Sequence, residues 1–184
     1  MSNMQCKPMG EDRYAGRKCT RFVAIATMLL LAACSQVLQQ AAQEPGADAA
    51  CALDGMALKD FPGPKAQIQY VEGKPDFFCN TMELFAVVLA PEQKRAIAGL
   101  FVQDMGKTDW DHPSGHWIAA KTALYVVGSK KTGSMGPTFA SFSDAQGAAA
   151  FVKKEGGQVV TFKQVGPKMV NMGDSAAHDA AMSH

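Results

Sequence analysis

The stretch Ala66-Gln-Ile-Gln-Tyr-Val71, with Glu72-Gly-Lys-Pro75 and Asp76-Phe-Phe78 after it, decides the fold predicted for this chain. Apolar and polar residues alternate over residues 66–71, as they do in a strand with one buried face. The glycine and proline of residues 72–75 are typical of a turn, and residues 76–78 continue as a second short strand. The chain therefore predicts a β-hairpin here.

A helix and a third strand are predicted directly after this hairpin. Asn80 precedes the helix and Glu83 follows at the third position, which is the spacing of a capping box. The apolar stripe of the helix consists of Leu84, Phe85, Val88 and Leu89. Residues 99–104 then return as a strand, so the first half of the domain has the order ββαβ.

The second half repeats this order. Its predicted elements are strands over residues 123–128, 138–142 and 158–162 and a helix between the last two strands. Ser143 is expected to cap this helix, with Gln146 as the third residue after it, and Gly156-Gly157 ends it. The predicted fold class is therefore α+β, with two ββαβ units packed together, over about residues 51–106 and 117–165.

The N-terminal segment has the features of a bacterial secretory signal. Five basic residues precede or flank an apolar run over residues 22–33, which is shorter than the roughly 20 residues of a membrane-spanning helix. Its end, Leu31-Ala-Ala-Cys34, resembles a lipobox, in which Cys34 is acylated and becomes the new N-terminus. We expect a signal peptide over residues 1–33, with an ordinary cleaved signal or a short anchor as the alternatives. Ser35, rather than an aspartate, follows Cys34 and favours the outer membrane.

Removal of this signal changes the charge and the cysteine content. The remaining chain has 13 basic and 15 acidic residues, which is not the balance of a nucleic-acid-binding protein. Only Cys51 and Cys79 remain as thiols, in an oxidising compartment where they could form a disulfide.

Both ends of the remaining chain are predicted to lack fixed structure. Residues 34–50 are rich in Gln and Ala and are interpreted as a flexible tether. Residues 166–184 have no sustained periodicity and are interpreted as a disordered tail that contains Met and His. One folded domain is therefore expected over residues 51–165.

Soft sulfur ligands suggest a copper site. Cys51 and Met56 lie five positions apart, thiolate and thioether sulfur suit Cu(I), and Gly55 allows the backbone to turn between them. Met135 lies in a loop next to Gly136 and Pro137 and is a third candidate ligand. The alternative for Cys51 and Met56 is packing in the core.

Three further residues are weaker candidates. His112 and His116 flank a segment with Pro113 and Gly115, and their imidazoles could bind copper or belong to a structural loop between the units. Cys79 precedes the helix at Asn80 and could be a ligand, a disulfide partner of Cys51, or a small buried apolar residue.

Taken together, these motifs are similar to those of the NosL family of copper-handling lipoproteins, over about residues 51–165. The motifs that carry the resemblance are Gly55-Met56, Phe61-Pro-Gly-Pro-Lys-Ala-Gln-Ile68, Phe78-Cys79, Val102-Gln-Asp-Met105, Asp109-Trp-Asp-His-Pro113, Gly115-His-Trp-Ile118, Tyr125-Val-Val-Gly128 and Met135-Gly-Pro-Thr138. Some members carry a second cysteine just before the Gly-Met pair, where this chain has Asp54.

The resemblance implies a Cu(I) chaperone that is anchored in the membrane through Cys34 and faces the periplasm. It implies that the chaperone serves assembly of the copper-sulfide site of nitrous-oxide reductase, together with the membrane complex NosDFY. The family fold of two ββαβ units agrees with the repeat above. The alternative is a lipoprotein scaffold that docks to a membrane complex without metal transfer. An enzyme is not expected, because no nucleophile and base are paired in the sequence.

Overall fold

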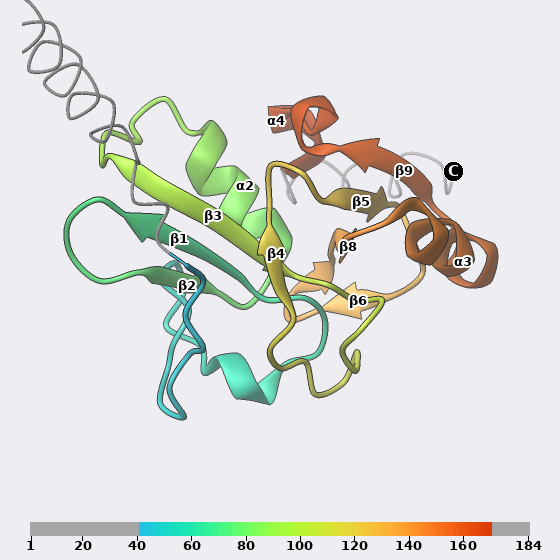
Figure 1. Ribbon diagram of the computed structural model, residues 1–184, viewed down its shortest axis with the longest axis horizontal. Coiled ribbons are helices and arrows are strands. Elements are labelled where there is room, and N and C mark those ends of the chain that lie inside the picture. Colours follow the sequence, from blue (N-terminus) through green and yellow to red (C-terminus); the bar gives the residue numbers. More distant parts are fainter. Residues whose placement is uncertain (1–40, 171–184) are drawn as a thin grey trace, which may run out of the picture. The chain divides into compact units, whose positions relative to one another are not determined.

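The computed structural model describes residues 41–170, and Figure 1 shows how their helices and strands are arranged. The predicted signal peptide, the lipidation site Cys34 and most of the predicted tail lie outside these residues. Among the described residues, no helix is long and apolar enough to cross a membrane.

The first unit is an antiparallel sheet with one helix. Its strands, in the order β2-β1-β3-β4, are β2 (Asp76–Phe78), β1 (Ala66–Tyr70), β3 (Ile97–Gln103) and β4 (Trp117–Ala119). Helix α2 (Thr81–Leu89) follows β2 and packs against β1. As predicted, Asn80 and Glu83 form its capping box, because the Asn80 side chain accepts a hydrogen bond from the helix backbone and Glu83 reaches back to the Asn80 N–H.

The second unit has the same order of elements. Its sheet, in the order β8-β5-β9, consists of β8 (Ala140–Phe142), β5 (Leu124–Val127) and β9 (Gln158–Thr161), with helix α3 (Ala145–Glu155) before β9. A small hairpin of β6 (Thr132–Gly133) and β7 (Gly136–Pro137) lies between β5 and β8. The short helices η2 (Leu58–Asp60), η3 (Phe162–Gln164) and α4 (Pro167–Val170) complete the domain. The predicted α+β fold class is confirmed.

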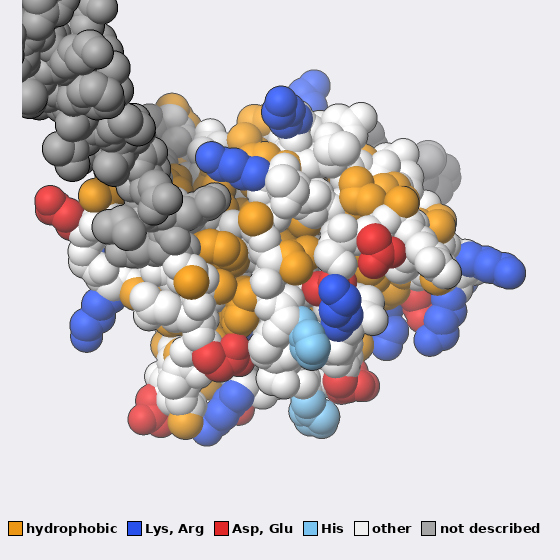
Figure 2. All heavy atoms as spheres, viewed as in Figure 1, with side chains coloured by type: hydrophobic (Ala, Val, Ile, Leu, Met, Phe, Trp, Pro, Cys, Tyr) orange, Lys and Arg blue, Asp and Glu red, His pale blue; other side chains and the backbone are white. Residues whose placement is uncertain are grey.

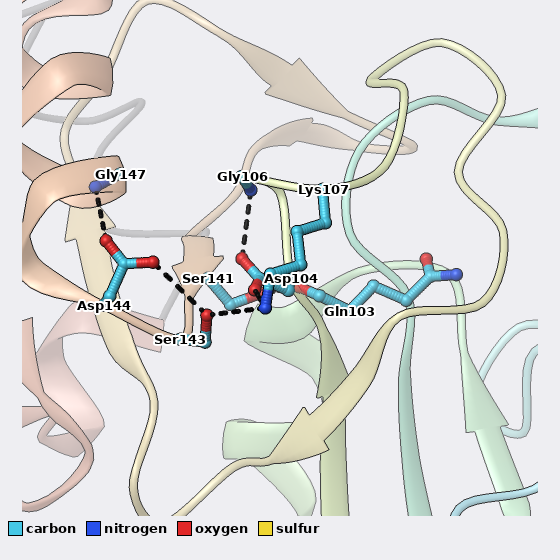
Figure 3. Close-up of polar contacts among 8 residues, drawn as sticks. All are labelled: Gln103, Asp104, Gly106, Lys107, Ser141, Ser143, Asp144 and Gly147. Atoms are coloured by element: carbon cyan, nitrogen blue, oxygen red, sulfur yellow. Dashed lines mark hydrogen bonds and ion pairs between the residues drawn. The ribbon is translucent and has the colours of Figure 1, made fainter.

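The predicted cap of the second helix is one residue too early. Asp144, not Ser143, is the N-cap, and its carboxylate accepts a hydrogen bond of 2.8 Å from the Gly147 N–H. The Ser143 hydroxyl instead faces Lys107 and Asp144 (Figure 3). Both residue types cap helices, and the end of β8 at Phe142 leaves Ser143 as a connecting residue.

The boundary between the two units also differs from the prediction. Residues 117–119 were expected to begin the second unit, but β4 pairs antiparallel with β3, with Phe101 opposite Ala119. The first sheet therefore recruits a strand that follows the whole first ββαβ unit in sequence. Pairing with β4 satisfies backbone groups that β3 would otherwise expose along its edge.

Residues 41–50, predicted as part of a flexible tether, are attached to the first sheet. The Gln43 backbone exchanges hydrogen bonds of 2.8 Å with the buried Gln67 side chain. The Glu44 carboxylate accepts 2.7 Å and 3.1 Å hydrogen bonds from the Trp117 indole and the Gly115 N–H. Buried glutamines need partners, and this segment supplies them. We name residues 43–50 the strap.

The part of the predicted tail that the structure describes, up to residue 170, contains a short helix. Residues 167–170 form α4, which packs against α2, and Met169 and Val170 contact the main core. Burial of these two apolar side chains supplies the free energy that orders the segment.

One core joins the two units. The ring of Phe85 on α2 packs edge-on against Tyr125 on β5, with centroids 5.0 Å apart. A second joint links the end of β3 to β8, where the Ser141 hydroxyl donates to the Gln103 carbonyl at 2.6 Å (Figure 3). The buried carboxylate of Asp104 accepts from the Gly106 N–H at 3.0 Å and pairs with Lys107 at 3.3 Å. These contacts fix the loops of the two units relative to each other.

Candidate metal centre

Cys51 lies at the start of a tight turn. The Cys51 N–H donates to the Met56 carbonyl at 2.8 Å, and the Gly55 N–H donates to the Cys51 carbonyl at 2.9 Å. Gly55 has φ 75°, a left-handed conformation that favours glycine. The Asp54 carboxylate accepts a 2.9 Å hydrogen bond from the Met56 N–H. The turn thus places the backbones of Cys51 and Met56 opposite each other.

Cys79 and Glu83 come from the start of α2. Cys79 immediately precedes the N-cap Asn80, and Glu83 lies one turn later. The capping box turns the Glu83 carboxylate back toward the helix start, which places it beside the Cys79 thiol. The capping box that begins the helix therefore also places the Glu83 carboxylate next to the Cys79 thiol.

These two segments meet in one cluster. The Cys51 Sγ lies 3.2 Å from Glu83 Oε2, and the Cys79 Sγ lies 3.6 Å from both carboxylate oxygens. One ligand atom from each of Cys51, Asp54, Cys79 and Glu83 can be chosen so that all lie within 4.8 Å of one another. Asp54 is exposed and the other three residues are buried. We name these four residues the thiol–carboxylate cluster.

The two thiols have opposite ionisation preferences. A hydrogen bond from the Cys79 thiol lowers the pKa of Cys51, and nearby backbone N–H groups at Asp54 and Leu53 add to this against the effect of burial. The same hydrogen bond to Cys51, together with burial, raises the pKa of Cys79. Cys51 is therefore the more acidic of the two thiols, and the thiolate is the form that binds metals.

Lys65 lies next to this cluster and is almost fully buried, with 3% of its surface exposed. Its ammonium donates to the Phe61, Gly63 and Cys79 carbonyls at 2.7, 3.1 and 3.4 Å. Burial lowers its pKa to about 8, against the opposing electrostatic influence of Cys79 and Glu83. At neutral pH the group therefore brings a positive charge to the cluster.

Met135 lies at the rim, in the hairpin between β6 and β7. Half of its surface is exposed, and its neighbour Ser134 accepts a hydrogen bond of 3.1 Å from the Cys79 thiol. The second unit thus brings the loop that carries Met135 to Cys79, although the two segments are far apart in sequence.

The two histidines lie elsewhere. His112 and His116 are exposed in the loop before β4, and neither belongs to the thiol–carboxylate cluster; imidazoles appear on the surface in Figure 2. The loop carries structural hydrogen bonds, since the Asp109 carboxylate accepts from the His112 N–H at 2.8 Å and Asp104 donates its N–H to the His116 carbonyl at 2.9 Å. This is the structural alternative considered from the sequence.

The sequence did not single out Glu83 or Asp54 as site residues. Glu83 was predicted only as a capping residue. The sequence feature that could have identified it as a site residue is Cys79, which immediately precedes the capping box. Asp54 was not predicted as a ligand, and the second thiol of the cluster comes from Cys79. Both cysteines are free thiols in this structure, so the possible disulfide is not formed.

The comparisons with known proteins converge on one family. The family profile described as NosL matches residues 42–170. The copper-binding lipoprotein NosL of Stutzerimonas stutzeri is 38% identical over 135 residues, which cover 73% of this chain and 70% of the relative. That of Achromobacter cycloclastes is 42% identical over 159 residues, 82% of each chain. The crystal structure of the copper chaperone NosL from Shewanella denitrificans is similar with a TM-score of 0.66 and 36% identity, covering 70% of this chain and 97% of that one.

Proposed function

The chain belongs to the NosL family, and we propose that it is a copper chaperone that carries Cu(I) as its cargo. We propose further that it is anchored through acylated Cys34 on the periplasmic side of a bacterial membrane. In this role it delivers copper for assembly of the copper-sulfide site of nitrous-oxide reductase, in cooperation with NosDFY. The relatives named for copper binding and the related copper chaperone support the role.

The observation that carries this proposal is the donor set. Two sulfur atoms and a carboxylate lie so close that they require protons, since the 3.2 Å contact between Cys51 and Glu83 would be repulsive between two anions. A cation that replaces the protons removes this repulsion. Thiolate and thioether ligands select Cu(I) among the common metal ions, and Cys51 and Met56 supply one of each.

Release of the ion requires an accessible ligand. We assign Cys51 and Met56 as the primary ligands, with the exposed Met135 as the ligand on the solvent side. Cys79 and Glu83 are buried, and we assign them no direct bond to the ion. Their role is to carry the proton or the negative charge that balances the charge of the site. A partner that brings its own soft ligand can displace Met135 first and take the ion by stepwise exchange. Four-coordinate structural sites, in contrast, are closed to such exchange.

The residue that tests this proposal is Cys51. The reduced domain is expected to bind one Cu(I), measured by competition with a colorimetric chelator under argon. Replacement Cys51→Ala should lower the affinity at least a hundredfold, whereas Met135→Ala should lower it less and should speed transfer to the chelator. His116→Ala serves as the matched control, because this exposed residue lies outside the cluster, and its affinity should equal that of the wild type.

An unchanged affinity in Cys51→Ala would contradict the copper site assigned here. Absence of stoichiometric copper binding by the wild type would instead favour the scaffold alternative. Delivery is tested separately, by loading of nitrous-oxide reductase in cells that carry Cys51→Ala or Cys34→Ala. Loss of activity with both variants is expected, and loss of membrane association only with Cys34→Ala.

A further inference from the structure

We propose that Lys65 is a specificity-determining residue whose buried positive charge biases the thiol–carboxylate cluster toward a monovalent cation. This inference rests on the proposed copper-binding function and deepens it. It assigns a role to a residue that is not a ligand and that the sequence offered only as part of the Phe61–Ile68 motif.

The hydrogen bonds of Lys65 identify it as an ammonium. Its Nζ lies within 3.4 Å of four backbone carbonyl oxygens, those of Phe61, Pro62, Gly63 and Cys79. An ammonium has three N–H donors, whereas a neutral amine has two and also a lone pair that would face a carbonyl. The surroundings contain only acceptors and therefore select the charged form.

This charge has no direct carboxylate partner among the described residues. None of the ion pairs in residues 41–170 includes Lys65, and the side chain is almost fully buried. A buried charge without a partner is unfavourable unless an opposite charge lies nearby. The Lys65 ammonium lies 3.4 Å from the Cys79 carbonyl, at the edge of the cluster, and Glu83 of the cluster acts on it electrostatically, so the cluster itself supplies the counter-charge.

The same ammonium then limits the charge that the cluster can accept. The thiol and carboxyl groups of the cluster supply negative charge to a bound cation, and the ammonium of Lys65 offsets one unit of it. The remaining positive charge of the ion then lies beside a buried ammonium, which repels it. Because the repulsion between Lys65 and the ion scales with the charge of the ion, it is twice as large for a divalent ion.

The test compares two soft ions of different charge on the reduced domain. Dissociation constants for Cu(I) and Cd(II) are measured by chelator competition at pH 7, and the thiolate-to-cadmium charge-transfer band verifies that Cd(II) binds the thiols. In Lys65→Met the ratio of the Cu(I) to the Cd(II) affinity should fall about tenfold relative to the wild type, as expected for removal of one nearby unit charge. A purely structural role would weaken both ions alike and leave this ratio unchanged.

Two variants separate charge from packing. Lys65→Arg retains the charge and should keep the ratio within about twofold of the wild type. Lys59→Met removes the same charge from an exposed position on η2, where solvent screens it, and should also leave the ratio unchanged. If Lys65→Met does not fold, Lys65→Gln replaces it, because its amide can still donate to the carbonyls.

A wild-type ratio in the folded neutral variant would overturn the role of Lys65 while leaving the copper site intact. A fall in the ratio that Lys65→Arg reproduces would overturn it as well, since the charge is then not the cause. Absence of Cu(I) binding by the wild type is a different outcome, because it would contradict the proposed function itself.

Discussion

The Cys51 Sγ lies 3.2 Å from Oε2 of Glu83, although 32 positions separate the two residues in the sequence. The same oxygen accepts the Asn80 N–H at 3.2 Å and thereby closes the capping box of α2. One carboxylate therefore begins a helix and contacts the candidate metal thiol. The position of this carboxylate is fixed by the helix, so the cluster is built on a rigid element.

We predict that Glu83→Gln weakens Cu(I) binding about tenfold while it preserves the helix. Glutamine is accepted at the third position of a capping box, so the free energy of unfolding should change by less than about 1 kcal/mol. The lost negative charge beside Cys51 reduces the attraction for the cation. Chelator competition and urea unfolding on the same sample separate the two effects.

Glu92→Gln is the matched control for this substitution, because Glu92 is exposed and lies beyond the end of α2. It should leave both quantities unchanged. Equal copper affinity of Glu83→Gln and the wild type would show that the carboxylate has only its capping role.

We predict that the two helix caps differ in strength. Asn80 is buried and its side chain also donates to the Pro137 carbonyl at 3.1 Å and accepts from the Thr138 hydroxyl at 2.7 Å, whereas the Asp144 bond to Gly147 is exposed. Asn80→Ala should destabilise the domain by about 2–4 kcal/mol, because it leaves buried partners unsatisfied. Asp144→Ala should destabilise it by about 1 kcal/mol. Urea unfolding measures the free energy of unfolding of both variants. Equal losses of stability would show that the contacts of Asn80 with Pro137 and Thr138 do not stabilise the domain.

We predict an acid-dependent contribution from Asp104. Burial raises the pKa of this carboxyl, but hydrogen bonds from Ser143, Gly106 and Lys107 outweigh it, so the pKa lies below its ordinary value. The stabilisation is therefore fully present above about pH 4 and is lost as the pH falls through the folded-state pKa. Asp104→Asn should cost about 1–3 kcal/mol at pH 7.

The deficit of Asp104→Asn should shrink between pH 7 and pH 3, because below the ordinary carboxyl pKa the wild type begins to lose the contribution of the ionised carboxylate. Urea midpoints at the two pH values test this. Asp60→Asn, at an exposed position on η2, provides the control and should match the wild type at both. A deficit that stays constant with pH would exclude the ionised carboxylate as its source.

We predict that Glu44 holds the strap on the first sheet. Glu44→Ala removes the acceptor of the Trp117 indole and the Gly115 N–H, so residues 43–50 should exchange amide hydrogens faster and be cleaved earlier by proteases. Global stability should fall by no more than about 1 kcal/mol, since both hydrogen bonds are exposed. Asp48→Ala in the same segment is the control, and unchanged exchange in Glu44→Ala would show that Gln43 alone anchors the strap.

The sequence predicted the elements that depend on local pattern. Alternation over residues 66–71, the Asn80–Glu83 capping box and the glycines after residue 155 specify backbone conformation within a few positions. Periodicity and helix caps depend on residues that are close together in the sequence. The order ββαβ could therefore be predicted for both units. The sequence could not predict whether Ser143 or Asp144 caps α3, because this depends on the residue at which β8 ends in the sheet.

Ionisation and clustering of side chains were decided by the tertiary structure. The sequence selected Cys51, Met56 and Met135 for their soft sulfur atoms, and the fold brings the loops of the last two near the Cys51 and Cys79 thiols, respectively. The sequence offered proximity of Cys79 to Cys51 only as one alternative, and it could not indicate that Glu83 contacts both thiols or that the buried Lys65 lies next to them. These relations join three segments of the chain, and the free energy of each charge depends on burial and on neighbours that only packing brings together. The residue types thus determined which chemistry is available, and the packing of the first unit determined which of these groups meet.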